Sequence, residues 1–424
     1  MESITSILSR FTISTGYNDI PKDALHDAKR IILDNLGCAL GGYTLDPSKN
    51  FIRTITKLGG TQESTILGDG SLIPSPLAAF VNAKLGNLMD MDDVFYNIGH
   101  QSPVVFYPAL AIAEKENVSG KDFLVAFTLG FDISSRVVLA LGTMFDKEGN
   151  RFVPSDITGF GHSIFGGTAA VGRLLHLNLE KMTNALGIAG IYSLAPLSHK
   201  SVTNMSMTKY QLDISSLNAV LSALLASEGC TGPQTILDDS IYAKALGKKT
   251  FNPSLLLDKL GERWYISETS IKPYPHCRHS HYALDLVKRI MEEKRIDVKD
   301  IISIEISGFK NYTVPPWNNP YPSDIFSAQF SVPYAVSLII HQIPPGPKWF
   351  DESLLNDKKI LEIARKVRFI PNLEIIKSMK NSYPLPIRKV PTTVRIICRS
   401  ETFEAKDLFA RGDGFAPSHK LSDE

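Results

Sequence analysis

The chain has 424 residues, and its 45 lysines and arginines nearly balance its 44 aspartates and glutamates, for a formal net charge of +1. A chain of this length forms about two or three domains. It can bury enough surface to fold without disulfide bonds. The balanced charge argues against a general nucleic-acid-binding protein. We find no uncharged apolar run of about 18 residues, so no membrane span is expected.

The N-terminus and the cysteines are typical of a cytoplasmic protein. Residues 1–20 mix Glu2, Arg10 and Asp19 with short apolar pieces, unlike the basic start and apolar core of a signal peptide. The four cysteines form no C-x-x-C pair, which disfavours a disulfide framework or a thiolate zinc site. We therefore expect reduced thiols and a cytoplasmic location.

Helical periodicity dominates roughly the first 265 residues. In residues 22–40 apolar side chains such as Leu25 and Ile32 recur on one helix face. Pro21 before this stretch and Gly41 after it are typical helix boundaries. Further helices are predicted at 76–89, 104–116, 120–143, 166–177, 180–195 and 209–228.

The pattern changes after residue 265. Apolar and polar residues alternate in 302–306 and again in 394–398, which predicts half-buried strands. Helices are expected at 281–294, 327–341 and 352–366. We therefore predict a mainly α protein with a large all-helical domain and a smaller α+β lid domain, and a ligand site in the cleft between them. The expected boundaries are 1–265 for the helical domain, 266–400 for the lid domain, and 401–424 for a C-terminal segment returning toward the helical domain.

The first candidate site is an acidic run, Asp90, Asp92 and Asp93, followed by His100. Grouped carboxylates need cations or hydrogen bonds to stay ionised, and a carboxylate that holds an imidazole suits general acid–base catalysis. We expect Asp90 to orient His100. The alternatives are a solvated acidic helix end and the D-x-D-D acid motif of class II terpene cyclases, which are usually longer and richer in aromatic residues.

The second candidate is the segment 272–281, which carries Lys272, Cys277, Arg278 and three histidines, His281 among them. Such a cluster suits binding of an anion and proton transfer. The alternatives are a polar surface loop and a metal site, but the spacing fits no common zinc motif. We expect no metal.

Two further features precede predicted helices. Lys209 stands at the head of the helix 209–228, where the alternative is a surface lysine. A glycine-rich stretch from Gly159 to Gly167 contains His162 and resembles a helix-start anion site. Close helix packing explains its glycines equally well, and it lacks the Gly-Lys-Ser/Thr of a phosphate-binding loop.

Several spaced motifs together resemble the MmgE/PrpD family of 2-methylcitrate dehydratases and cis-aconitate decarboxylases, over nearly the whole chain. The matching runs are Ile32–Gly42, Ala78–Ala83, Met89–Asp93, His100–Ser102, Thr208–Lys209, Gly229–Pro233, Lys272–His281 and Phe330–Tyr334. The run Lys272-Pro-Tyr-Pro-His-Cys277-Arg278 is close to the motif of the dehydratase branch, whereas the decarboxylases tend to have His at the position of Cys277.

The resemblance implies a helical domain with a smaller lid domain, usually in a homodimer, and a metal-independent lyase without a cofactor that acts on a polycarboxylate. By motif position, the residues that carry over as catalytic are Asp90, His100, Lys209, Lys272 and Tyr334. The family also has a histidine ahead of the helix at 166–177, but an ungapped count places Ile157 there. His162 is the nearest histidine and is our substitute. Val94 and Gln101 also depart from the usual pattern.

We predict dehydration of a 2-methylcitrate-like acid. His100 acts as base or acid, and Tyr334 or His162 takes the opposite role. The residues expected to bind substrate, besides the lysines, are Ser102, Cys277, Arg278 and His281. Three alternatives remain: a decarboxylase of the cis-aconitate type, an epimerase or isomerase of a dicarboxylate, and a catalytically inactive binding protein. No nucleic-acid or membrane partner is expected.

Overall fold

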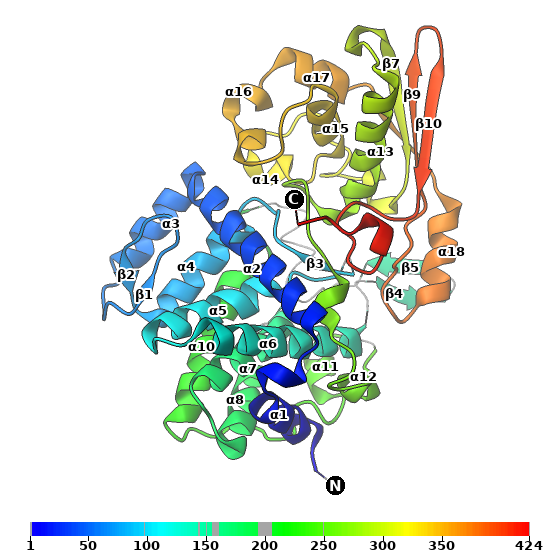
Figure 1. Ribbon diagram of the computed structural model, residues 1–424. Coiled ribbons are helices and arrows are strands. Elements are labelled where there is room, and N and C mark those ends of the chain that lie inside the picture. The colour runs from blue at the N-terminus through cyan, green and yellow to red at the C-terminus, as the bar shows by residue number, and fades with distance from the viewer. Residues whose placement is uncertain are drawn as a thin grey trace. The chain divides into compact units, whose positions relative to one another are not determined.

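The computed structural model describes residues 2–96, 98–142, 145–149, 151–154, 161–193, 206–248 and 250–423. The chain folds into two compact units. Unit 1 comprises 1–88, 92–201 and 208–269, and unit 2 comprises 89–91, 202–207 and 270–424. The predicted mainly α class is confirmed, because helices make up most of the described elements of both units (Figure 1). Ile157, which an ungapped count places where the family has a histidine, lies outside the described residues. Gly159, the start of the glycine-rich stretch, lies outside them too.

Unit 1 is built from helices, of which α4, α5, α6, α7 and α8 are buried over most of their length. The helices predicted from periodicity are present with slightly different ends, and four more, α1, α3, α11 and α12, were not predicted. The helices are α1 Ile4–Ser14, α2 Lys22–Tyr43, α3 Asp46–Thr56, α4 Ser75–Asn87, α5 Ser102–Lys115, α6 Gly120–Leu141, α7 Ile164–Leu174, α8 Leu179–Tyr192, α10 Leu212–Ser227, α11 Ile241–Ala245 and α12 Ser254–Leu257. Its short strands are β1 Ser64–Thr65, β2 Leu72–Ile73, β3 Val94–Phe95, β4 Phe145–Glu148 and β5 Arg151–Pro154, and β6 Thr269–Ser270 lies at the boundary of the two units.

Glycines let the central helices of unit 1 approach one another. A Cβ on Gly130 of α6 would lie 2.5 Å from the Gly166 carbonyl oxygen of α7, and one on Gly166 would lie 2.3 Å from the Gly130 oxygen. A Cβ on Gly167 would lie 2.1 Å from the Val104 oxygen of α5. Any larger residue would therefore push these helices apart. At Gly166 and Gly167, close packing thus accounts for the glycine-rich stretch.

Helix α6 is long and apolar enough to cross a membrane by length and composition alone, but its most apolar 18-residue window is 100% buried. It also carries a buried ion pair, in which Arg136 Nε lies 2.6 Å from Asp132 Oδ2. The Arg136 guanidinium donates further to the carbonyl oxygens of Asp258 and Arg263. The apolar character of α6 thus reflects its place inside the helical core.

Unit 2 combines a four-stranded sheet with helices (Figure 1). The strand order is β10-β9-β7-β8, with β7–β8 parallel and the other pairs antiparallel. Helix α13 packs against β9 and β10. The strands are β7 Ile301–Ser307, β8 Val367–Ile370, β9 Thr392–Cys398 and β10 Thr402–Asp407. The helices are α13 Arg278–Lys294, α14 Ile325–Ala328, α15 Val332–Ile340, α16 Glu352–Leu355, α17 Lys358–Ala364 and α18 Leu373–Ser382.

Two predictions for this unit need correction. The helices expected at 327–341 and 352–366 are each divided, because a capping side chain starts a new helix inside each stretch. Ser331 accepts from the Tyr334 amide at the start of α15, and Asp357 accepts from the Lys359 amide at the start of α17. The segment 401–424 is grouped with unit 2, where β10 pairs with β9. Its expected return toward the helical domain stays a prediction.

Candidate active site

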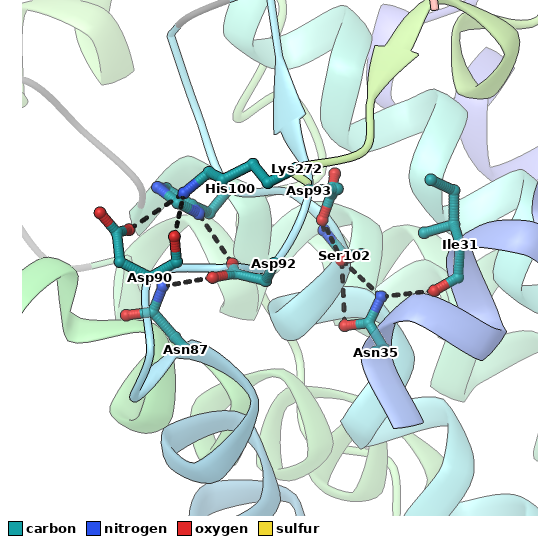
Figure 2. A network of polar contacts seen from close by, with 9 residues as sticks. All are labelled: Ile31, Asn35, Asn87, Asp90, Asp92, Asp93, His100, Ser102 and Lys272. Carbon is teal, nitrogen blue, oxygen red and sulfur yellow. Dashed lines mark hydrogen bonds and ion pairs between the residues drawn. The ribbon is translucent and has the colours of Figure 1, made fainter. Parts of the chain in front are cut away.

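A buried carboxylate–imidazole pair lies in unit 1, just before α5. Asp92 Oδ2 is 2.7 Å from His100 Nδ1, and the two side chains are 0% and 6% exposed (Figure 2). The other oxygen, Asp92 Oδ1, accepts from Asn87 Nδ2 at 2.8 Å. Because an ionised carboxylate only accepts, this contact places a proton on Nδ1. We expected Asp90 to orient His100; the carboxylate that holds Nδ1 is that of Asp92.

Lys209 and its neighbour Tyr210 join this pair within unit 1. The Tyr210 ring stacks on the His100 ring with centroids 4.9 Å apart, and Lys209 Nζ lies 5.3 Å from the same tyrosine centroid. Lys209 is 1% exposed, which excludes the alternative of a surface lysine. A buried ammonium group and a carboxylate-held imidazole that contact the same aromatic ring can together bind an acid and move a proton.

A second polar network fixes the start of α5. The Ser102 hydroxyl lies within hydrogen-bond reach of Asp93 and of Asn35 Oδ1, to one of which it donates its single proton, and it accepts from Asn35 Nδ2 at 2.8 Å (Figure 2). Asn35 Nδ2 also donates to the Ile31 carbonyl oxygen at 2.8 Å. These bonds tie Asp93 and α5 to helix α2. They give Ser102 a full set of protein partners, so substrate binding by Ser102 stays a prediction.

His162 is buried without hydrogen bonds. Among the described residues, neither ring nitrogen of His162 has a hydrogen-bond partner, and the same is true of Gln101 Nε2. Burial lowers the pKa of His162 to about 3, helped by the positive charge of Lys248. The imidazole is therefore neutral at ordinary pH. It can donate or accept one hydrogen bond, but it cannot serve as a cationic acid.

In unit 2, Lys272 is paired with Asp90. Lys272 Nζ donates to the Asp90 carbonyl oxygen at 2.6 Å and to Oδ1 at 3.2 Å, and both side chains are fully buried (Figure 2). Asp90 has a φ of 54°, a left-handed conformation that aspartate adopts more readily than bulkier residues. By its contacts Asp90 belongs with Lys272 in unit 2, whereas Asp92 and His100 belong to unit 1.

The polar side chains at the start of α13 form hydrogen bonds and an ion pair with other groups of the protein. Arg278 Nη2 lies 2.5 Å from Asp413 Oδ1, and Nη1 donates to the Arg411 carbonyl oxygen at 2.9 Å. His281 Nε2 lies 3.0 Å from the His276 carbonyl oxygen. Burial lowers the pKa of His276 to about 4 and that of His281 well below its usual range. These contacts indicate structural roles for Arg278 and His281, and no finding tests their predicted role in substrate binding.

Two further candidate residues, Cys277 and Tyr334, keep their protons at ordinary pH. Cys277 caps the start of α13, and burial raises the pKa of its thiol to about 11. The Tyr334 hydroxyl donates to the Trp349 carbonyl oxygen at 2.8 Å, and burial raises its pKa well above the usual range. A thiol of this pKa is a poor nucleophile. Tyr334 is a proton donor already engaged by a backbone carbonyl.

The sequence pattern did not reveal that Asp92 contacts His100 Nδ1, and it did not single out Tyr210. Asp92 lies within the acidic run, but alternation along the chain cannot tell which carboxylate faces His100. An aromatic residue directly after Lys209 was the only available signal for Tyr210. Asp90, Asp92 and His100 are of the ligand types that could hold a metal ion.

The chain matches known proteins over nearly its whole length. The sequence model of the MmgE/PrpD N-terminal domain matches residues 6–253, and that of the C-terminal domain matches residues 274–424. Cis-aconitate decarboxylase of Homo sapiens is 24% identical over 387 residues, covering 87% of this chain and 76% of the relative. Cis-aconitate decarboxylase of Aspergillus terreus is 24% identical over 393 residues, with 86% and 77% covered.

The mouse enzyme of the same name is 22% identical over 387 residues, covering 87% of this chain and 76% of the relative. These identities are low, but both domain models match in the expected order and together span almost the entire sequence. The chain belongs to the MmgE/PrpD family.

Proposed function

We propose that the protein is a lyase acting on a small di- or tricarboxylate, with His100 as proton carrier and Lys209 as carboxylate-binding cation. The observation that carries the proposal is the arrangement around Tyr210 in unit 1, where a carboxylate-held imidazole and a buried ammonium group contact one ring. A positioned imidazole contributes about 10²- to 10⁴-fold to a proton transfer. A buried cation stabilises the negative charge that develops on a carboxylate.

Dehydration of a 2-methylcitrate-like acid is our first candidate reaction. His100 Nε2 removes the proton α to a carboxylate, and Lys209 stabilises the resulting enediolate. The C–O bond then breaks, and the leaving hydroxide takes a proton to depart as water. His162 is neutral at ordinary pH, so the imidazolium formed on His100 is the better donor in unit 1. The likeness of Lys272–Arg278 to the dehydratase branch favours this candidate.

Decarboxylation is the second candidate, and the names of the relatives favour it. In this reaction the C–C bond to a carboxylate breaks, carbon dioxide leaves, and the electron pair stays on the α carbon. Lys209 stabilises that charge and His100 delivers a proton to the carbon. Both reactions therefore use the same two groups, and the order of bond breaking and proton transfer distinguishes them.

The test is incubation of the purified protein with citrate-like, aconitate-like and succinate-like acids in D2O, followed by mass spectrometry. Loss of water indicates dehydration, and loss of carbon dioxide indicates decarboxylation. Incorporation of deuterium into the acid without loss of water or carbon dioxide indicates epimerisation or isomerisation. Binding of an acid without any of these changes would contradict the proposal and favour an inactive binding protein.

The remaining expectations are part of the same proposal. The lyase works without a metal or an organic cofactor, since Lys209 supplies the positive charge and His100 moves the proton. The family resemblance also implies a homodimer with a smaller lid domain, and the cysteine pattern favours a cytoplasmic location. Light scattering coupled to size-exclusion chromatography would measure the oligomeric state.

A further inference from the structure

We propose that Tyr210 is a positioning residue that fixes the ring plane of His100 and the place of the Lys209 ammonium group. This inference rests on the role proposed above for His100. It extends that role to a residue outside the acid–base and carboxylate-binding groups.

The backbone at Tyr210 is in a conformation that bulky residues rarely adopt. Tyr210 has a φ of 67° and Gln211 a φ of 57°, so two consecutive non-glycine residues are left-handed. They form the short 3-10 turn Lys209–Gln211 that precedes α10. Strained residues of this kind persist only where the surrounding structure holds them, and they cluster at functional sites.

The contacts of His100 explain what this conformation achieves. The bond from Nδ1 to Asp92 fixes one atom of the ring. The Tyr210 ring packs against one face of the imidazole, and the two rings stack at an interplanar angle of 27° with centroids 4.9 Å apart. The hydrogen bond and the stacked face both bear on the direction of Nε2. Tyr210 itself is only 6% exposed.

The same ring also contacts the cation of the proposed site. Lys209 Nζ lies 5.3 Å from the Tyr210 centroid, within the range of a cation–π interaction. One aromatic side chain thus contacts both the proton carrier and the carboxylate-binding group. A displacement of the ring would change both positions together.

Helix α10 provides the rigid support. It begins at Leu212, directly after the strained turn, and Asp213 in its first turn pairs with Lys84 of α4 at 3.3 Å. Both charged side chains of this pair are buried. The start of α10 is therefore tied to α4, and the turn carrying Tyr210 is held between this anchor and His100.

The test compares Tyr210→Phe, which keeps the ring, with Tyr210→Leu, which removes it. We expect Tyr210→Leu to lower kcat at least tenfold, because it displaces the proton carrier, and to raise KM as well, because it displaces the carboxylate-binding ammonium group. Tyr210→Phe should stay within about threefold of the wild type. The matched control is Tyr242→Leu, a buried tyrosine of unit 1 that packs on Phe165. It should lower stability and leave kcat unchanged.

A second readout does not depend on activity. In protein labelled with 15N-histidine, the His100 signals, identified with His100→Gln, should move in Tyr210→Leu and not in Tyr242→Leu or Tyr210→Phe. If the chain proves inactive on every acid tested, this measurement still decides whether the stack orients His100. An unchanged His100 spectrum together with unchanged kcat in Tyr210→Leu would overturn the inference.

Tyr210→Met is the reserve variant if Tyr210→Leu does not fold, since methionine fills a similar volume with a flexible chain. It is expected to show the same loss of kcat and the same change in the His100 spectrum. Failure of both variants to fold, with Tyr210→Phe fully active, would assign the ring to the core and overturn the positioning role.

Discussion

Asp92 Oδ2 accepts a hydrogen bond from His100 Nδ1 at 2.7 Å inside unit 1, with the two side chains 0% and 6% exposed. This bond places a proton on Nδ1, which leaves Nε2 as the nitrogen that takes up a proton in the proposed reaction. It assigns the orienting role to the second aspartate of the acidic run. Asp90, the first aspartate, instead pairs with Lys272.

Replacing Asp92 by asparagine should lower kcat roughly 10²-fold or more with little change in KM, because the imidazolium loses its carboxylate partner in the transition state. Steady-state kinetics on the substrate found by the acid panel provides the measurement. Asp27→Asn in α2 is the matched control, a buried aspartate of unit 1 that pairs with Arg30. A kcat of Asp92→Asn within twofold of the wild type would argue against the assigned role.

Stability should fall on acidification through His162. The folded-state pKa of His162 is lowered to about 3, whereas the unfolded chain titrates near 6.5, so the unfolded state binds the proton first. Stability is therefore full above about pH 6.5 and is lost as the pH falls toward 3. Between pH 7 and pH 5 this single group accounts for about 2 kcal/mol of lost stability.

His162→Gln should remove that part of the pH dependence. Urea unfolding of both proteins at pH 7 and pH 5 measures the difference, and groups common to the two proteins cancel. The free energy of unfolding of the variant should decrease by about 2 kcal/mol less than that of the wild type. Equal decreases would show that His162 is protonated in the folded state.

The Lys272–Asp90 pair should behave as a buried ion pair. Lys272→Met leaves a buried carboxylate without its cation and should cost about 3 kcal/mol or more of stability. The double variant Lys272→Met with Asp90→Asn should recover part of this loss, giving a coupling of about 1–3 kcal/mol in the cycle. Equilibrium unfolding of the four proteins measures it.

The control for this cycle is an exposed pair of the same charge types. Lys49 Nζ lies 2.7 Å from Asp46 Oδ1, with side chains 70% and 90% exposed. Lys49→Met should leave the free energy of unfolding unchanged within error. Additive effects at Lys272 and Asp90 would mean that the pair is not coupled in solution.

Metal removal should leave the activity intact. Prolonged dialysis against EDTA is expected to preserve the full rate, since the proposed chemistry uses an ammonium group and an imidazole. Elemental analysis of the dialysed enzyme confirms that divalent ions are gone. Loss of turnover on chelation and its recovery with one metal ion would instead assign a ligand role to residues such as Asp92 and His100.

Local patterns predicted the fold better than the site. The helix at 22–40 and the strands at 302–306 and 394–398 were predictable because period and end signals are local. The breaks at Ser331 and Asp357 carried local signals too, a capping serine followed by Pro333 and a capping aspartate, but apolar periodicity outweighed them.

The site depends on contacts between residues that the spacing of motifs along the sequence does not reveal. Arg278 pairs with Asp413, 135 residues away, so nothing near Arg278 in the sequence indicates a structural partner. The choice between Asp90 and Asp92 depends on a left-handed turn at Asp90 that directs neighbouring carboxylates differently. Burial of Lys209 likewise follows from packing around α10, whereas its sequence context is also typical of a surface residue.

The most direct test of the central claim is the rate of hydrogen exchange at the α carbon of the substrate acid in D2O, measured by mass spectrometry for the wild type and His100→Gln. Folding and acid binding of the variant are checked by thermal shift. The account predicts that His100→Gln still binds the acid but loses at least about 10²-fold in exchange and in product formation. A His100→Gln variant that is folded and exchanges at the wild-type rate would contradict the role of His100 as the proton carrier.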